Sequence, residues 1–313
     1  MTIPKQFRLQ AGELKPLVVR ADAPAARRAL GHLGAIVAAG VALWVALGTL
    51  WAVPLTLLLG YLLAFLFSAE HEAAHQTAFR TRALNHLLGH VGGLVIVLPY
   101  KYYRAFHWDH HRFTQEPERD PELATPLPTS RLGLVWYLTG LPTWCDRLRM
   151  LFVHGVLGRV MEPWVQPDER ALIVREARCY LASYLGVIAV SLAFRSLAAL
   201  WLWVIPVTVG NLFLRPYLLA EYTGCSQTLD MLDNTRTTYT NAFVRYFAWN
   251  MPHHVEHHAY PAVPFHALPQ LNRLLGAHIK HAGRGYRDST AAVLRHLRRA
   301  DGAPSSTSFP SRS

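Results

Sequence analysis

Eight of the 17 histidines in this chain fall in three short clusters, which read HEAAH at 71–75, HWDHH at 107–111 and HVEHH at 254–258. On a helix, residues four apart share one face, and a residue three apart joins them. The first cluster therefore directs two imidazoles the same way, and each of the others directs three. Histidines at this spacing are a common metal chelate. The eight candidate ligands are His71, His75, His107, His110, His111, His254, His257 and His258.

Eight imidazoles are more than one metal ion needs, because a catalytic zinc usually takes three protein ligands and a water. Two ions with about four nitrogens each fit the number better. A single pair of this kind is often just two surface histidines, but three clusters at helical spacing are hard to explain that way. Imidazole suits Zn, Cu, Fe and Ni, so the ligands alone leave the metal open.

Each cluster also contains a carboxylate, and the three are Glu72, Asp109 and Glu256. None lies on the imidazole face of its own helix. They are expected either to accept N–H bonds from the ligands of a neighbouring cluster or to lie exposed beside an arginine. Asp120 and Asp230 are two further candidates for carboxylates that lie just outside the metal ligands. The simpler interpretation is that both are solvated loop charges.

Three other histidines resemble the clusters in spacing only. His253 precedes the third cluster and lies off its stripe, and the other clusters repeat without such a residue, so we expect His253 not to bind metal. His86 and His90 are four residues apart but belong to no matching motif. We expect them to have structural or interfacial roles.

The elements that position these clusters are strongly apolar. The chain is 51% hydrophobic and only 16% charged, and residues 29–69 contain no Asp, Glu, Lys or Arg. That run is about twice the roughly 20 residues that one membrane-spanning helix needs. The alternative is a pair of buried helices in a soluble protein, but uncharged runs of this length are rare there. The predicted fold is an all-α integral membrane protein with four spans in two hairpins, at about 33–50, 53–69, 179–194 and 197–214.

Charge gives the predicted orientation. The net charge is +11, and six basic residues precede the first hairpin. By the positive-inside rule the N-terminus is cytoplasmic, and two hairpins return the C-terminus and a helical cap that holds the metal site to the same side. Anionic lipid headgroups explain the basic excess better than nucleic acid does, since no nucleic-acid motif is present. The preference for Arg over Lys hints at a GC-rich bacterial genome, and so at a bacterial inner membrane.

The remaining segments are expected to complete one membrane-embedded domain over residues 1–300. The apolar stretch 84–99 is short enough to be a re-entrant or interfacial helix. Residues 130–178 suit amphipathic helices on the membrane face, and 264–300 suit one or two basic helices. The tail 301–313 is expected to be disordered.

The three clusters together resemble the histidine boxes of the membrane fatty acid desaturase superfamily. The flanking text, RAFHWDHHRFTQEPERDPE and NMPHHVEHHAYPAVPFHALP, is similar to the second and third boxes of bacterial members. The likeness covers most of residues 30–275. It implies two non-haem iron ions at the cytoplasmic membrane face, which activate O2 and remove hydrogen from an unactivated C–H bond.

The resemblance also implies a ligand set. The eight box histidines would hold the irons, and related enzymes often add a further histidine or a water held by an asparagine. Relatives often read EH where this chain has Glu221 and Tyr222. That departure favours Asn250, four residues before His254, as the additional ligand through a water.

Several functional alternatives fit the same boxes. Desaturation of a fatty acyl chain is the expected activity, and a hydroxylase or ketolase acting on a lipid, alkane or carotenoid is the alternative. A histidine-rich membrane metal transporter is a third, but it would need polar residues within the spans. The chain has no dinucleotide fingerprint, no iron–sulfur cysteine set and no evident haem domain. Electrons are therefore expected from a separate ferredoxin or cytochrome b5-like protein. The acyl chain length, its carrier and the double-bond position are not encoded in these motifs.

Overall fold

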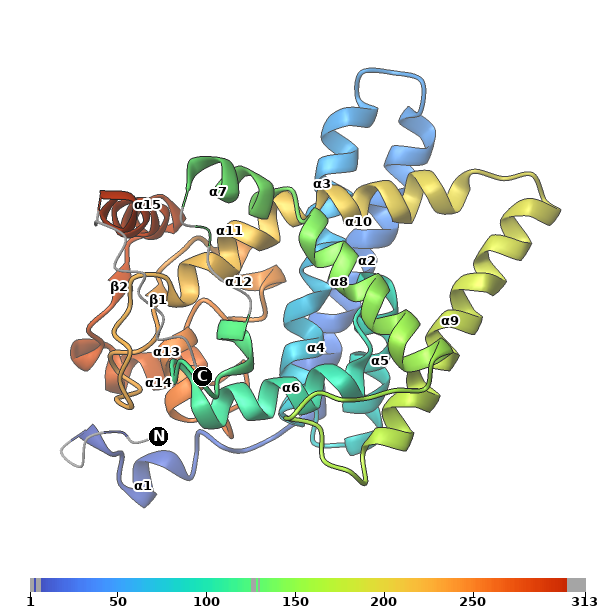
Figure 1. Ribbon diagram of the computed structural model, residues 1–313. Coiled ribbons are helices and arrows are strands. Elements are labelled where there is room, and N and C mark those ends of the chain that lie inside the picture. Colours follow the sequence, from blue (N-terminus) through green and yellow to red (C-terminus); the bar gives the residue numbers. More distant parts are fainter. Residues whose placement is uncertain (1–2, 4–6, 125–127, 129, 303–313) are drawn as a thin grey trace, which may run out of the picture.

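The computed structural model describes residues 3, 7–124, 128 and 130–302. In these residues the chain is almost entirely helical, with a single pair of very short strands. A helical hairpin projects at the top of the view in Figure 1, and smaller helices gather at the left as a cap. The mostly helical architecture that the sequence predicted is confirmed.

The first apolar run forms the projecting hairpin. After the short helix α1 (Ala11–Leu14), helix α2 (Asp22–Ala46) leads into a turn containing Gly48. The chain returns through α3 (Ala52–Ala64) and continues almost without interruption into α4 (Leu66–Ala74). Valines and leucines remain exposed on α2 and α3, as expected of surfaces that face lipid. The predicted first hairpin is therefore present, and its return arm delivers the first histidine cluster directly.

The short apolar stretch after the first cluster does not form a straight span. Helix α5 (Arg82–Ile96) ends at Val97 in a left-handed conformation, and α6 (Tyr100–Phe113) starts after Pro99 at an angle of 101°. Proline suits this position because its missing N–H costs nothing at a helix start. The bend places the second histidine cluster beside the first, and α4 packs on both α5 and α6.

The middle of the chain is helical, as predicted. The 3₁₀ turn η2 (Pro121–Ala124) follows the second cluster, and the amphipathic segment forms α7 (Arg131–Leu138), α8 (Leu141–Leu151) and the π-helical turn η3 (Phe152–Val156). Helix α8 packs against η3 and α9. Of these elements, η2 packs on α6, and α7 packs on α8 and α11.

The second apolar block differs from the predicted hairpin. Helix α9 (Arg170–Ala193) packs mainly on η3, α6 and α8, whereas the next segment crosses α3 (Figure 1). That segment consists of η4 (Leu200–Val204), α10 (Ile205–Val209) and α11 (Asn211–Tyr222). Gly60 and Gly210 meet at the crossing, where a Cβ on either would strike the backbone of the other helix. Small residues that allow such close approach are typical of helix contacts in membranes.

In the part of the chain that the structure describes, three helices are long and apolar enough to cross a membrane, and their bounds are Asp22–Ala46, Ala52–Ala74 and Leu200–Tyr222. The bent pair α5–α6 is also apolar enough, but it begins just after the first histidine cluster and ends on the second, and these clusters meet, so it forms a re-entrant loop. The predicted span 179–194 lies in α9 but is not one of these, because the first half of α9 carries charged residues such as Arg175 and Glu176. An integral membrane protein is supported, and the predicted span 179–194 stays a prediction.

The cap follows α11 and carries the third cluster. Strand β1 (Thr237–Thr238) pairs in parallel with β2 (Ala282–Gly283), which the sequence did not predict. Around this pair lie five helical elements: α12 (Ala242–Phe247), α13 (His254–Ala259), α14 (Leu268–Leu275), η5 (Gly276–His278) and α15 (Tyr286–Gly302). The predicted basic helices in 264–300 are present. Most of the predicted tail, 303–313, lies outside the described residues, and residues 301–302 end α15.

Candidate metal centre

The three histidine clusters meet in the interior. The first lies on α4, with His75 just past its last residue but still in a helical conformation; the second lies on α6, and the third on α13. All eight box histidines are buried. Helices from three separate parts of the chain thus direct imidazoles toward one another, as the helical spacing predicted.

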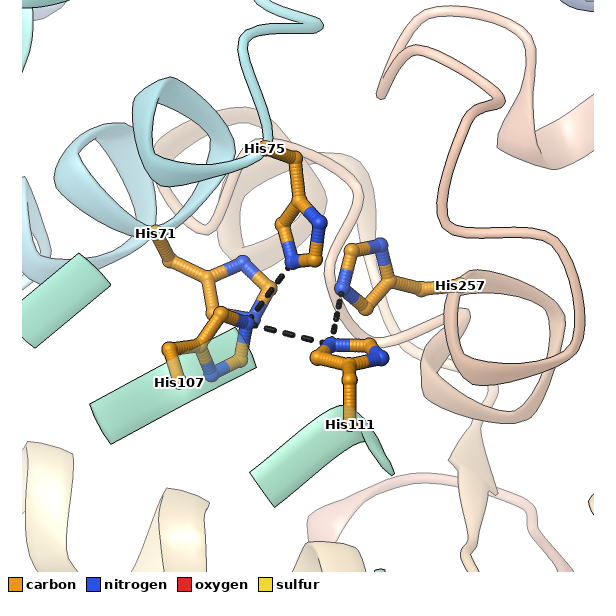
Figure 2. Close-up of side chains that lie close together, drawn as sticks. All are labelled: His71, His75, His107, His111 and His257. Atoms are coloured by element: carbon orange, nitrogen blue, oxygen red, sulfur yellow. Dashed lines mark hydrogen bonds between the residues drawn. The ribbon is translucent and has the colours of Figure 1, made fainter. Parts of the chain in front are cut away.

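Five of these residues form a compact set, which we call the five-histidine group: His71, His75, His107, His111 and His257. One ring nitrogen from each lies within 4.8 Å of all the others. Figure 2 shows the rings converging from α4, α6 and α13. The Nε2 atoms of His75 and His107 are 2.8 Å apart, and His111 Nε2 is 3.1 Å from both His107 Nε2 and His257 Nε2.

The five-histidine group fits a transition-metal ion. Ligand nitrogens about 2.0–2.1 Å from an ion lie roughly 3–4 Å from one another, which is close to the spacing seen here. Burial, followed by the neighbouring His75 and His71, holds the pKa of His257 well below its ordinary value. The ring is therefore neutral at pH 7, and its lone pair is free to bind a metal.

Aromatic side chains hold several of these rings. The His107 ring stacks on Tyr103 with centroids 5.2 Å apart, and Trp108 lies 5.1 Å from the His75 ring. The Nδ1 atoms of His71, His75, His111 and His257 have no hydrogen-bond partner among the described residues. The five-histidine group is therefore oriented mainly by packing.

The other three box histidines surround a side chain that the sequence had not marked as a site residue. The hydroxyl oxygen of Tyr222 lies 2.8 Å from His110 Nε2, 2.5 Å from His254 Nε2 and 3.0 Å from His258 Nε2. We call these four residues the Tyr222 group. It adjoins the five-histidine group, since the His258 and His111 rings stack with centroids 4.1 Å apart.

Hydrogen-bonding side chains face the outer nitrogens of the Tyr222 group. His110 Nδ1 is 2.8 Å from an Asp120 oxygen, and His258 Nδ1 is 3.2 Å from Thr114 Oγ1. His254 Nδ1 lies 3.4 Å from Glu221 Oε1 but makes no hydrogen bond with a described residue. Partners of this kind fix the orientation of metal-ligating histidines and make them better donors. Asp120 is itself buried, so the simpler interpretation of it as a solvated loop charge is wrong.

The three carboxylates inside the boxes have other partners. Glu72 accepts a hydrogen bond from the backbone N–H of Phe265, and Asp109 lies 3.9 Å from Arg112 at the surface. Glu256 accepts hydrogen bonds from Thr237 and Asn272, which ties the third box to β1 and α14. Their expected role beside the ligands of a neighbouring box falls instead to Asp120 and Glu221. The reason is chain geometry, since carboxylates off the imidazole stripe point away from the convergent rings.

The remaining candidates lie around the edges of the site. The side-chain amide of Asn250 donates a hydrogen bond to the Phe265 carbonyl at 2.9 Å. The hydroxyl of Tyr222, in contrast, lies beside three box histidines. His253 caps α13 and lies 3.5 Å from Glu256. His90 lies 3.3 Å from Glu176, and both His86 and His90 contact the ring of Tyr100.

A cavity of about 660 Å³ reaches both groups of ligands. Its wall is built from α4, α6, α8 and α11, and it includes His71 and His107 from one group and His110, His254 and Tyr222 from the other. Small-molecule pockets are typically about 300–1,000 Å³. The site therefore combines convergent imidazoles with room for a substrate beside them.

Comparison with known proteins agrees with this geometry. Residues 48–290, which hold all three boxes, match the family described as Fatty acid desaturase. The chain is also 25% identical over 226 residues to an acyl-lipid omega-3 desaturase (cytochrome b5) of the endoplasmic reticulum from Arabidopsis thaliana. That match covers 64% of this chain and 57% of the length of the relative. The chain belongs to the fatty acid desaturase family.

Proposed function

We propose that this protein desaturates a fatty acyl chain, using O2 and two non-haem iron ions. The observation that carries the proposal is the convergence of all eight box histidines in one buried layer beside a cavity of about 660 Å³. Family membership supports the class of reaction, and the curated relative is itself named as an acyl-lipid desaturase.

The two groups of ligands would each hold one ion. The five-histidine group would bind the first and the histidines of the Tyr222 group the second, which follows the predicted division of eight imidazoles between two ions. Iron bound there would activate O2 for removal of hydrogen from a C–H bond. Asp120 and Thr114 keep their histidines in position, and the surrounding burial keeps bulk water away from the reacting chain.

The cavity suits an extended apolar substrate at the ligand end. Phe67, Leu98 and Phe106 provide an apolar lining beside His71 and His107. Charged side chains, among them Asp146, Arg147 and Arg215, line the same cavity on α8 and α11. An acyl chain would lie along the apolar wall, with a polar part of the same molecule meeting the charged side chains.

The reaction needs an outside source of electrons. Forming one C=C bond removes two hydrogens from the substrate, and O2 takes these together with two electrons and two protons to give two waters. We propose that a separate ferredoxin or cytochrome b5-like protein supplies the electrons. The curated relative carries cytochrome b5 in its name, and the present chain has no motif for a redox cofactor besides the irons.

A second hollow offers a docking place for this donor. It is lined by Arg8, Trp108, His111, Arg112 and His258, so it borders both ligand groups. An acidic donor fits its basic rim, and Trp108 is 43% exposed while its ring contacts His75. Reversing Arg112 to Glu should raise the KM for the donor several-fold and leave kcat at saturating donor unchanged. The matched control is Arg119→Glu, an exposed arginine outside the hollow.

The enzyme would face the cytoplasm from a bacterial inner membrane, with both termini on the cytoplasmic side. This rests on the basic residues before the first hairpin and on the uncharged turn between α2 and α3. Protease accessibility of tags at the two ends in sealed inner-membrane vesicles tests the orientation. Protection of either tag on the side opposite the cap would contradict it.

Product analysis tests the proposed reaction. The full chain is expressed in a heterologous host beside His257→Ala, and lipids are profiled by mass spectrometry. Acyl chains that lose two hydrogens only with the unchanged protein support desaturation. Gain of one oxygen instead would indicate the hydroxylase alternative, and zinc without any oxygen-dependent product would favour the metal transporter.

A further inference from the structure

We propose that the phenol oxygen of Tyr222 is itself a ligand of the second metal ion, together with His110, His254 and His258. Tyr222 is the last residue of α11, and its oxygen lies 2.5–3.0 Å from the Nε2 atoms of all three histidines. The inference rests on the metal centre proposed above and names a ligand that the histidine boxes do not contain.

Side chains hold two of the three outer nitrogens. His110 Nδ1 lies 2.8 Å from the Asp120 carboxylate, and His254 Nδ1 lies 3.4 Å from Glu221 without a hydrogen bond. Thr114 gives its own hydroxyl proton to the His110 carbonyl at 2.8 Å. It can therefore only accept from His258 Nδ1.

Four atoms that can give an electron pair to a metal thus converge: the Nε2 atoms of three buried histidines and one phenol oxygen. The phenol has a single proton, so it can donate a hydrogen bond to only one of the three nitrogens. A metal ion can accept an electron pair from each of the four atoms.

The donor set suits iron. Three imidazoles and one phenol oxygen supply the roughly four ligands that one ion takes in such sites, and tyrosine is a known ligand of haem iron. The hydroxyl proton leaves to water as the oxygen binds, just as a coordinating thiol loses its proton. The second ion would then carry one anionic ligand, whereas the five-histidine group supplies neutral ones.

Optical and vibrational spectra of the purified, iron-loaded full chain test this directly. A phenolate bound to ferric iron gives a visible charge-transfer band, and light absorbed in that band enhances the tyrosine ring vibrations in the Raman spectrum. The oxidised protein is expected to show both, and ring-deuterated tyrosine should shift the vibrations. Tyr222→Phe should lose the band. The matched control, Tyr217→Phe, should keep it, because Tyr217 lines the same cavity from the same helix but does not meet the histidines.

A second variant guards against misfolding. Tyr222→His keeps a side chain that can donate to a metal, so it should retain two irons per chain and still lack the band. Wild-type protein with two irons and desaturase activity but no phenolate band would overturn the Tyr222 assignment and leave the proposed function standing. A band that survives in Tyr222→Phe would also overturn it. Protein that binds no iron at all would overturn both.

Discussion

The five-histidine group and the Tyr222 group lie side by side, yet they are built differently. The first is a cluster of imidazoles held by aromatic packing, with four Nδ1 atoms that lack partners among the described residues. The second has fewer imidazoles, but His110 and His258 lie at hydrogen-bond distance from Asp120 and Thr114, and His254 lies 3.4 Å from Glu221 without a hydrogen bond. Metal binding by the five-histidine group would depend on the number of ligands. Metal binding by the Tyr222 group would depend on the orientation and charge of its ligands.

This difference predicts that the two groups respond to different substitutions. Ligands oriented by carboxylates are stronger donors, so the Tyr222 group should favour the more highly charged ferric state of its ion. The five-histidine group has no carboxylate at hydrogen-bond distance in the described part of the chain and should depend on the presence of each ring. Substitutions of ligands and of their outer partners separate the two designs.

The largest effect is expected from removing a ring of the five-histidine group. His257→Ala should lower product formation by more than about 100-fold, the upper end of what loss of an outer partner alone costs, and should reduce bound iron. The measurement is product per chain together with iron content. His253→Ala is the matched neighbour, and we expect it to retain most activity because His253 faces Glu256 instead. Equal losses in the two variants would contradict the assignment.

An intermediate effect is expected from Asp120→Asn. The amide cannot accept the His110 N–H with the strength of a carboxylate, so iron affinity at the Tyr222 group should fall about 10–100-fold. Titration of metal-free protein with ferrous iron measures this. Asp109→Asn on α6 is the control, since Asp109 faces Arg112 at the surface and its loss should leave iron affinity unchanged. If Asp109→Asn lowered iron affinity more than Asp120→Asn, the proposed role of Asp120 as the partner of His110 would be wrong.

The smallest effect is expected from Thr114→Val. This change removes one neutral hydrogen bond to His258, and such bonds contribute about 1 kcal/mol, which corresponds to roughly fivefold in iron affinity. The same ferrous titration measures it. A loss as large as that of Asp120→Asn would show that the charge of the outer partner matters less than its presence.

The local spacing of residues was enough to predict much of the site and the first part of the fold. The helical spacing within the three boxes correctly predicted which rings share a face, and the uncharged run 29–69 predicted the α2–α3 hairpin. The outer partners could not be found this way. Asp120 reaches His110 because the loop after α6 folds back, and Tyr222 arrives from a helix more than a hundred residues further along the chain.

The packing of the second apolar block was also beyond local patterns. Hydrophobic runs reveal apolar segments but not the neighbours on which they pack, and α9 packs on η3, α6 and α8. Gly60 and Gly210 instead let the later segment cross α3 closely. The departure at Glu221 and Tyr222 was the one sequence signal near the second group. It indicated a missing histidine, whereas the structure shows an oxygen donor in contact with three box histidines.

Iron content of the purified full chain tests the central claim most directly. The account predicts two irons per chain for the wild type, and fewer than two for both His257→Ala and His254→Ala, because each variant damages a different group. A single iron in the wild type, or zinc in place of iron, would contradict the assignment of two separate iron sites.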